Sequence, residues 1–181
     1  KGITREEGLA LLALPDEQVP EALRAAFEVR KVHFGKRVKL CMLQNARSGL
    51  CPEDCHYCSQ SSVSTAMIDR YPLMDQELLI EGARRACEAN AKRYCMVTSG
   101  RGPSDEDIEH FCQVSRAIKR QFPLELCICV GILSEEQARR LKEAGVGWVN
   151  HNLNTSERFY PEICSTHTYQ DRVTTVQNVR N

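Results

Sequence analysis

The chain has 181 residues, of which 42% are hydrophobic and 27% are charged. This balance is typical of a folded globular protein and excludes a disordered chain. The 24 Lys and Arg residues equal the 24 Asp and Glu residues in number, so the sequence predicts neither a nucleic-acid partner nor an anionic membrane partner. No apolar run approaches the roughly 18 residues that a membrane span requires.

Ten cysteines are a high number for such a chain. The opening residues 1–7 contain neither an initiator Met nor the apolar core of a signal peptide, so we expect further sequence upstream. Several cysteines lie within strand-like or helix-like runs rather than in the loop-rich pattern of a secreted disulfide scaffold. Disulfide bonds are rare in the cytoplasm, and we therefore expect a cytoplasmic protein that keeps its thiols for metal or redox chemistry.

The first 36 residues are predicted to form an N-terminal helical segment. Amphipathic patterns indicate helices over Thr4–Leu14 and Glu17–His33. Thr4 and Glu7 have the spacing of a capping box, which starts the first helix. Residues 37–181 are predicted to form a separate α/β part.

In this second part, four strand patterns alternate with helix patterns. Strands are expected at 38–43, 94–98, 124–130 and 146–150, and helices at 75–90, 104–121, 134–145 and 168–181, with a Cys-rich loop at 45–64 and a short segment at 155–160. This alternation predicts βα units and a parallel sheet, which both an open sheet and a barrel would satisfy. A closed (β/α)8 barrel takes about 250 residues, so the chain would supply only its first four βα units.

The strongest chemical signal is the motif Cys51-Pro-Glu-Asp-Cys55-His-Tyr-Cys58, in the loop after the first predicted strand. Its C-x3-C-x2-C spacing can bring three sulfurs to three corners of an iron–sulfur cube. Structural zinc, the main alternative, uses four protein ligands, and the local set stops at three. His56 is too close to Cys55 and Cys58 to bind the same metal and is predicted to be a loop residue. We expect a [4Fe–4S] cluster with one iron open to a small molecule.

The aromatic residue before the last cysteine completes a pattern that resembles the signature of the radical S-adenosylmethionine (SAM) superfamily. Five blocks in succession resemble biotin synthases in particular. They are residues 49–61, 93–103, 126–131, 149–156 and 168–172, and the similarity runs from about Ile3 to Arg180. The resemblance implies a TIM-type (β/α)8 barrel of the radical SAM kind, of which this chain holds about the first half.

The resemblance also implies an activity, the insertion of sulfur into dethiobiotin by means of a 5′-deoxyadenosyl radical. It places the [4Fe–4S] cluster on Cys51, Cys55 and Cys58, and an auxiliary [2Fe–2S] or other iron–sulfur cluster, the sulfur source, partly on Cys95 and Cys127. The implied partners are dethiobiotin, SAM, an electron donor such as flavodoxin or ferredoxin, and a second copy in a full-length homodimer. Because further ligands would lie on later strands, this chain alone is expected to be inactive.

The resemblance assigns binding residues as well, and no side chain as a catalytic acid or base. SAM would be bound by Tyr57, Thr98, Asn152, Asn154 and Arg172, and dethiobiotin by Asn150 and Asn152. Because Asn150, Asn152 and Asn154 alternate at a strand end, we expect their amides to share one face, where they can both donate and accept. Asn154 stands where the family has Asp, with one acceptor oxygen fewer. His151 is expected to face the other way and to be packed.

The other cysteines have no such support. Cys129, two residues after Cys127, would share its face and is a weaker alternative ligand. The cysteines predicted to be structural are Cys41, Cys87, Cys112 and Cys164. Two alternatives remain open: another radical SAM enzyme of the hydrogenase-maturation or methylornithine-forming kind, and a non-catalytic metal-binding module. Cys95 and Cys127 favour sulfur insertion over both.

Overall fold

The structure, a computed structural model, describes residues 2–180. The chain divides into two compact units, Lys1–Val38 and Lys39–Asn181. The first unit contains α1 (Arg5–Leu12), the 3-10 helix η1 (Asp16–Gln18) and α2 (Val19–Phe34). No residue of α1 or α2 is buried.

The predicted capping box at the start of α1 is confirmed. Thr4 Oγ1 accepts from the Glu7 N–H at 3.2 Å, and Glu7 Oε2 accepts from the Thr4 N–H at 2.6 Å. The second predicted helix begins with the 3-10 turn η1 and ends at Gly35, whose φ of +60° is a conformation that favours glycine.

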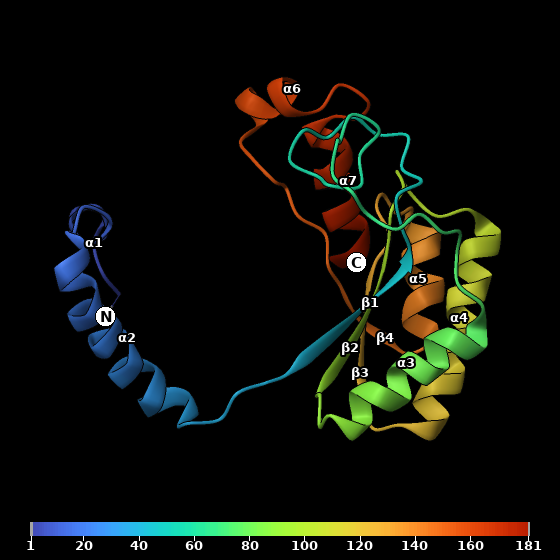
Figure 1. The fold of residues 1–181 in the computed structure, drawn as a ribbon, viewed down its shortest axis with the longest axis horizontal. Helices are drawn as coiled ribbons and strands as arrows, with labels where there is room; N and C mark the ends of the chain where they lie inside the picture. The colour runs from blue at the N-terminus through green and yellow to red at the C-terminus, as the bar shows by residue number, and fades with distance from the viewer. Residues whose placement is uncertain (1, 181) are drawn as a thin grey trace. The chain divides into compact units, whose positions relative to one another are not determined.

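The second unit is built on a four-stranded parallel sheet in the order β1-β2-β3-β4, with helices between successive strands (Figure 1). The strands are β1 (Cys41–Arg47), β2 (Arg93–Thr98), β3 (Glu125–Cys129) and β4 (Val146–Val149). The helices are α3 (Gln76–Glu88), α4 (Asp105–Gln121), α5 (Glu135–Glu143), the 3-10 helix η2 (Glu157–Phe159), α6 (Tyr160–Ile163) and α7 (Tyr169–Arg180). Strands in sequential order are typical of a singly wound barrel, and the predicted partial barrel is confirmed.

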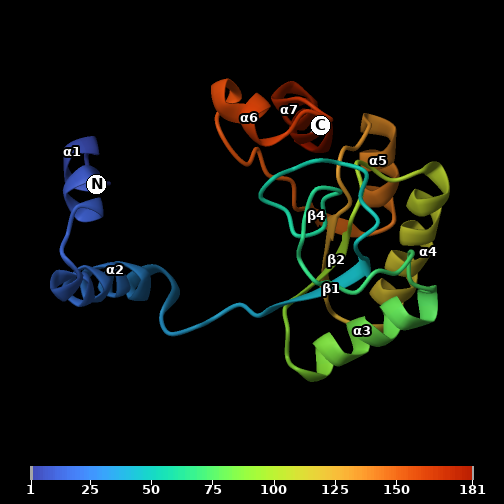
Figure 2. The same cartoon turned by 45° about the horizontal axis from the view of Figure 1, so that its top comes forward.

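The main core lies between one face of this sheet and α3, α4 and α5 (Figure 2). Tyr94 and Met96 of β2 and Leu126 and Ile128 of β3 are buried there. Side chains alternate between the two faces of a strand, so Cys95 and Cys127 point to the opposite, inner face. The helices therefore stabilise the sheet from one side and leave the inner side for chemistry.

Several predicted boundaries differ from the structure. β1 runs over Cys41–Arg47 instead of 38–43, because its ladder with β2 pairs Cys41 with Arg93 and continues to Arg47 opposite Thr98. Residues 45–47, predicted to open the loop, therefore belong to the strand. On α3, Leu78 is 53% exposed, while Leu79 and Gly82 are buried.

The helix starts in the second unit follow the sequence signals closely. Ser104 with Asp107 and Ser134 with Gln137 form reciprocal capping boxes at α4 and α5. Gly145, predicted as the stop of α5, has a φ of +98° directly after the cap residue Ala144. Within the described residues, none of these helices is both long and apolar enough to span a membrane.

Candidate iron–sulfur and SAM site

The loop that follows β1 holds the three closely spaced thiols. Backbone hydrogen bonds of 3.1 Å in both directions between Ser48 and Tyr71 join its two ends. The Gly49 N–H donates to the Gln60 side-chain oxygen at 2.9 Å, and the φ of Gly49 is +69°. The loop is therefore a closed unit at the carboxyl end of the sheet.

Backbone N–H groups point at two of the three sulfurs. The Gln60 N–H donates to Cys58 Sγ at 3.4 Å. Cys51 Sγ accepts from the backbone N–H groups of Glu53 and Gly100, which lower its pKa against the larger effect of burial. Such bonds stabilise thiolates and set the potential of iron–sulfur clusters. Gly100 follows β2, so the Cys51 sulfur lies between two neighbouring βα loops.

The separation of the three thiols fits a cluster better than a single ion. Burial is the main cause that raises the pKa of Cys51, and the charge of the Cys58 thiolate adds to it. The charge of the Cys51 thiolate in turn raises the pKa of Cys55, so the three thiols lie near one another. Among the described residues, however, they do not form a group whose ligand atoms all lie within 4.8 Å. One zinc ion would need its sulfurs about 3.8 Å apart, since Zn–S bonds are about 2.3 Å long. In a cluster each thiolate binds a different iron.

The two acidic residues between Cys51 and Cys55 attach the loop to the segment before α7. The Asp54 carboxylate accepts from the backbone N–H of Ser165 at 3.0 Å and of Thr166 at 3.3 Å. These bonds, led by the Ser165 hydroxyl, hold the pKa of Asp54 far below its usual value. Glu53 accepts from the Thr166 hydroxyl at 2.8 Å and lies 2.5 Å from His167.

This attachment brings an unexpected thiol to the loop. Cys164 Sγ lies 3.7 Å from Cys55 Sγ, and both side chains are buried. Cys164 was predicted to be structural, and neither His167 nor Glu53 was singled out. The two-residue gap between Cys164 and His167 is the only sequence signal that could have drawn attention to them, because Cys55 is 109 residues away.

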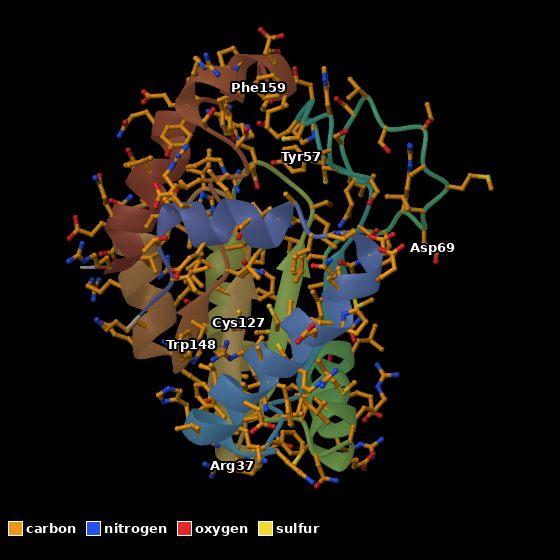
Figure 3. All side chains as sticks on the ribbon, turned by 90° about the vertical axis from the view of Figure 1, so that its left-hand side faces the viewer. Arg37, Tyr57, Asp69, Cys127, Trp148 and Phe159 are labelled. Carbon is orange, nitrogen blue, oxygen red and sulfur yellow. The ribbon has the colours of Figure 1, made fainter. Side chains whose placement is uncertain are left out.

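Four of the predicted SAM-binding residues come together around the loop. The Asn154 amide donates to the Tyr57 hydroxyl, and Arg172 of α7 donates to the Asn152 carbonyl. Tyr57 lies at the loop end of the molecule in Figure 3, and burial followed by the Cys55 charge raises its pKa. The fifth residue, Thr98, ends β2 opposite Arg47.

The predicted alternation of the three asparagines is wrong. β4 ends at Val149, and the Asn150 N–H donates to the Ile128 carbonyl at 2.8 Å. Beyond that point Asn154 has a φ of +68°, so the strand does not continue and a common face is not formed. His151 is half-buried, as expected, and its Nε2 has no hydrogen-bond partner among the described residues. Burial lowers its pKa to about 4.

Cys95 and Cys127 face each other on the inner side of the sheet. They are register partners on β2 and β3, and their residues are 3% and 6% exposed. A hydrogen bond between the thiols raises the pKa of Cys95 and lowers that of Cys127 to about 7. Cys129 lies on the same face, where burial raises its pKa. Next to Cys127 on the sheet is Trp148 of β4 (Figure 3).

The remaining cysteines predicted to be structural have different surroundings. Cys112 is fully buried in the main core, and Cys87 packs against the core while half-buried. Cys41 is exposed instead. Because it shares the inner face with Cys95 through the β1–β2 register, it lies beside the predicted auxiliary site.

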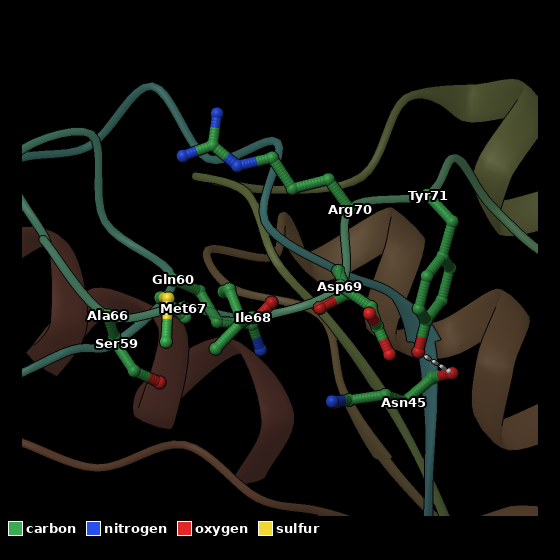
Figure 4. Close-up of a pocket in the computed structure, with 10 residues that line it drawn as sticks. Asn45, Ser59, Gln60, Ala66, Met67, Ile68, Asp69, Arg70 and Tyr71 are labelled. Atoms are coloured by element: carbon green, nitrogen blue, oxygen red, sulfur yellow. Dashed lines mark hydrogen bonds between the residues drawn. The ribbon is translucent and has the colours of Figure 1, made fainter.

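A separate depression of about 790 Å³ lies between the end of β1 and residues 66–71, the last part of the loop (Figure 4). Its wall includes Asn45, whose backbone carbonyl accepts from the Tyr71 hydroxyl at 3.1 Å, and Asp69 and Arg70. No cysteine lines it. The depression is therefore not the place where the thiols gather.

The radical SAM superfamily pattern matches residues 47–181, a range that includes the three-thiol loop and all four strand ends. The chain belongs to the radical SAM superfamily. Membership implies a [4Fe–4S] cluster and SAM as cofactors, and the loop thiols and the sulfur-directed N–H groups fit such a cluster.

The chain is also similar in sequence to curated biotin synthases. The chain is 50% identical over 181 residues to a biotin synthase of Halalkalibacterium halodurans, covering 100% of this chain and 54% of the relative. It is 51% identical over 178 residues to a biotin synthase of Anoxybacillus flavithermus, covering 98% of this chain and 54% of the relative. The chain spans about half the length of the curated relatives it matches.

The fold is shared with more distant enzymes of solved structure. The crystal structure of a methylornithine synthase superposes with a TM-score of 0.84 over 99% of this chain and 53% of that chain, at 22% sequence identity. At this identity the likeness concerns the fold alone.

Proposed function

We propose that this radical SAM chain supplies the cluster-binding half of a biotin synthase, which inserts sulfur into dethiobiotin. The main support is the identity of about one half to biotin synthases along the whole chain. The inward-facing pair Cys95 and Cys127 favours sulfur insertion over other reactions of the superfamily, since two adjacent thiols at the sheet centre can bind a second cluster.

In this proposal the loop residues Cys51, Cys55 and Cys58 bind three irons of the [4Fe–4S] cluster. When bound, the cluster supplies one electron to the SAM sulfonium, whose carbon–sulfur bond breaks to give a 5′-deoxyadenosyl radical. The chain contributes by orienting the reactants and excluding water. The N–H groups of Gln60 and Gly100 offset the charge that accumulates on the sulfurs.

The residues around the loop would bind SAM. Arg172 reaches the Asn152 carbonyl from α7 and would direct its remaining guanidinium donors to the methionine carboxylate. Asn154 and Tyr57, already hydrogen-bonded to each other, would contact the ribose and the adenine. The backbone at Thr98 would face the methionine amine. Apart from Thr98, these residues lie around the loop, which supports a SAM site next to the cluster.

The substrate would bind further along the same strand end. Asn150 and Asn152 are exposed and offer both donors and acceptors, which suit the ureido ring of dethiobiotin. An electron donor of the flavodoxin or ferredoxin class would supply the reducing electron, and the whole protein would form a homodimer. All ten cysteines are free thiols, which supports a reducing cytoplasmic location.

The test is an anaerobic assay of the whole protein that contains this chain, reconstituted with iron and sulfide. We expect a brown protein that bleaches on reduction and that forms 5′-deoxyadenosine much faster when dethiobiotin is present, together with biotin. Equal amounts of 5′-deoxyadenosine with and without dethiobiotin would refute the proposed substrate. A protein that binds no iron at all would refute the radical reaction.

A further inference from the structure

On the side of Cys55 that faces α6 and α7, three potential metal ligands form a buried group. Cys55 Sγ lies 3.7 Å from Cys164 Sγ, which lies 3.3 Å from Nδ1 and 3.9 Å from Nε2 of His167. One ligand atom from each residue lies within 4.8 Å of the others. The three residues are 8%, 4% and 7% exposed. Cys164 and His167 have no part in the proposed function.

These separations match the edges of a tetrahedral metal site. With Zn–S bonds of about 2.3 Å and Zn–N bonds of about 2.0 Å, two sulfurs lie about 3.8 Å apart, and a sulfur and a nitrogen about 3.5 Å apart. The observed Sγ–Sγ distance of 3.7 Å is already at this value. A single ion therefore needs only small side-chain movements here, in contrast to the wider set Cys51, Cys55 and Cys58.

The histidine also has the support that metal-binding histidines usually have. Its Nδ1 lies 2.5 Å from Oε2 of Glu53, a carboxylate as buried as the ring itself. An Nδ1–H bond to a carboxylate fixes the ring and leaves the lone pair of Nε2 for a metal. In the structure that nitrogen lies 2.9 Å from the hydroxyl of the buried Tyr160 and 3.3 Å from Nη1 of Arg172, so both groups have to move aside when a cation binds.

The charges of the three side chains and their access to solvent also favour a bound cation. Two thiolates and a neutral imidazole balance the charge of a divalent cation, and these are the forms in which cysteine and histidine bind metals. A cavity of about 460 Å³ is lined by Tyr160, Cys164 and His167. It gives an ion a route from the surface.

We propose that Cys55, Cys164 and His167 bind one thiophilic divalent cation, of which Zn²⁺ is the type, when the protein lacks its cluster. Cys55 is shared with the cluster loop, so the cation and the cluster exclude each other. The cation site stands independently of the proposed function, and only this exclusion depends on Cys55 being a cluster ligand. A cation at this site would hold the loop against the α6–α7 segment and delay cluster loading.

The first test uses Co²⁺ as a spectroscopic probe for Zn²⁺, with the whole protein kept reduced, anaerobic and cluster-free. We expect one Co²⁺ per chain, with tetrahedral absorption bands and thiolate charge transfer, displaced by Zn²⁺. Cys164→Ser and His167→Asn should each weaken binding at least about 10-fold. Cys51→Ser and Cys58→Ser, matched controls from the same loop, should leave it within about 2-fold.

The opposite pattern of Co²⁺ binding would overturn the site. If Cys51→Ser or Cys58→Ser loses tetrahedral Co²⁺ while Cys164→Ser binds it normally, the ion belongs to the loop thiols. Absence of tetrahedral binding in the unsubstituted protein would overturn it as well. Because Cys164→Ser could fail to fold, X-ray absorption at the zinc edge of the unsubstituted protein provides a second measurement. Two sulfur ligands with a histidine nitrogen support the site, and three sulfurs refute it.

The exclusion is tested by the rate of cluster reconstitution. One equivalent of Zn²⁺ should slow cluster formation in the unsubstituted protein and have little effect in Cys164→Ser. If Zn²⁺ binds as described but loading is equally fast, the exclusion is wrong. If the metal-free protein forms no cluster at all, the proposed function fails while the cation site remains.

Discussion

Glu53 Oε2 lies 2.5 Å from His167 Nδ1, and the side chains of both residues are almost completely buried. Glu53 stands between the first two thiols of the cluster motif, and His167 precedes α7. The Thr166 hydroxyl donates to the same carboxylate oxygen at 2.8 Å. This contact joins segments 114 residues apart and attaches the cluster loop to the rest of the barrel.

Replacing Glu53 with Ala should weaken the attachment of the loop. The variant leaves the His167 ring and the Thr166 hydroxyl without their buried acceptor, and we expect a loss of about 3 kcal/mol in the free energy of unfolding. Urea denaturation measures it. The control Glu81→Ala removes an exposed carboxylate paired with Arg84 and should leave the free energy of unfolding nearly unchanged. Equal losses in the two variants would contradict the attachment.

Replacing Cys127 with Ala should separate the two halves of the proposed reaction. Cys127 contacts Cys95 on the inner face and not the cluster loop, so 5′-deoxyadenosine formation should partly survive while biotin formation stops. Cys55→Ala should abolish both. The control Cys129→Ala, on the same face of β3, should retain some biotin formation. The assay is product analysis with the reconstituted whole protein, and equal loss of both products in Cys127→Ala would count against the division of roles.

Asn154 allows its side chain and its backbone to be tested separately. The φ of +68° suits glycine but strains alanine. Asn154→Gly loses only the amide that meets Tyr57 and should raise the KM for SAM about 5-fold, for a lost hydrogen bond of about 1 kcal/mol. Asn154→Ala should show the same KM effect and additionally unfold about 1 kcal/mol more easily. An unchanged KM in Asn154→Gly would remove Asn154 from the SAM site.

Gly131 has little tolerance for a side chain. Its φ is +84°, and a Cβ atom would lie 2.2 Å from the Arg101 carbonyl oxygen. We expect Gly131→Ala to lower the free energy of unfolding by about 3 kcal/mol, because the backbone after β2 has to move. Gly147 has no atom within 4 Å of its Cβ position, so Gly147→Ala should change stability by about 0.5 kcal/mol or less. Thermal and urea denaturation compare the two.

His151 should make the protein sensitive to mild acid. Burial is the main cause that lowers its pKa from 6.5 to about 4, and the Arg172 charge adds to the effect. The unfolded chain therefore takes up a proton that the folded chain excludes, so stability is complete above pH 6.5 and falls as the pH drops toward 4.

His151→Gln should lose less stability than the unsubstituted protein between about pH 7 and about pH 4. Urea denaturation at several pH values measures the difference, and the carboxylates, which titrate in both proteins, cancel. His33→Gln, on the exposed surface of α2, provides the control. Parallel pH curves for His151→Gln and the unsubstituted protein would show that His151 is not responsible.

The sequence alone determined the features that depend on near neighbours. The capping box at Thr4 is formed as predicted, and the helices predicted from 104 and 134 begin at capping boxes on Ser104 and Ser134, because a side chain three residues away needs only a local turn. The four strands and their parallel arrangement followed from hydrophobic runs that alternate with helix patterns. The C-x3-C-x2-C loop could be recognised because its chemistry lies within eight residues.

Only the tertiary structure decided the features that join distant segments. The extent of β1 depends on its ladder with β2, so polar residues such as Asn45 enter the strand although their local pattern predicts a loop. The left-handed turn at Asn154 breaks the predicted alternation. Cys164 and His167 reach Cys55 because α6 and α7 pack against the loop. Spacing along a chain fixes short-range geometry, whereas contacts across more than a hundred residues depend on how the whole domain packs.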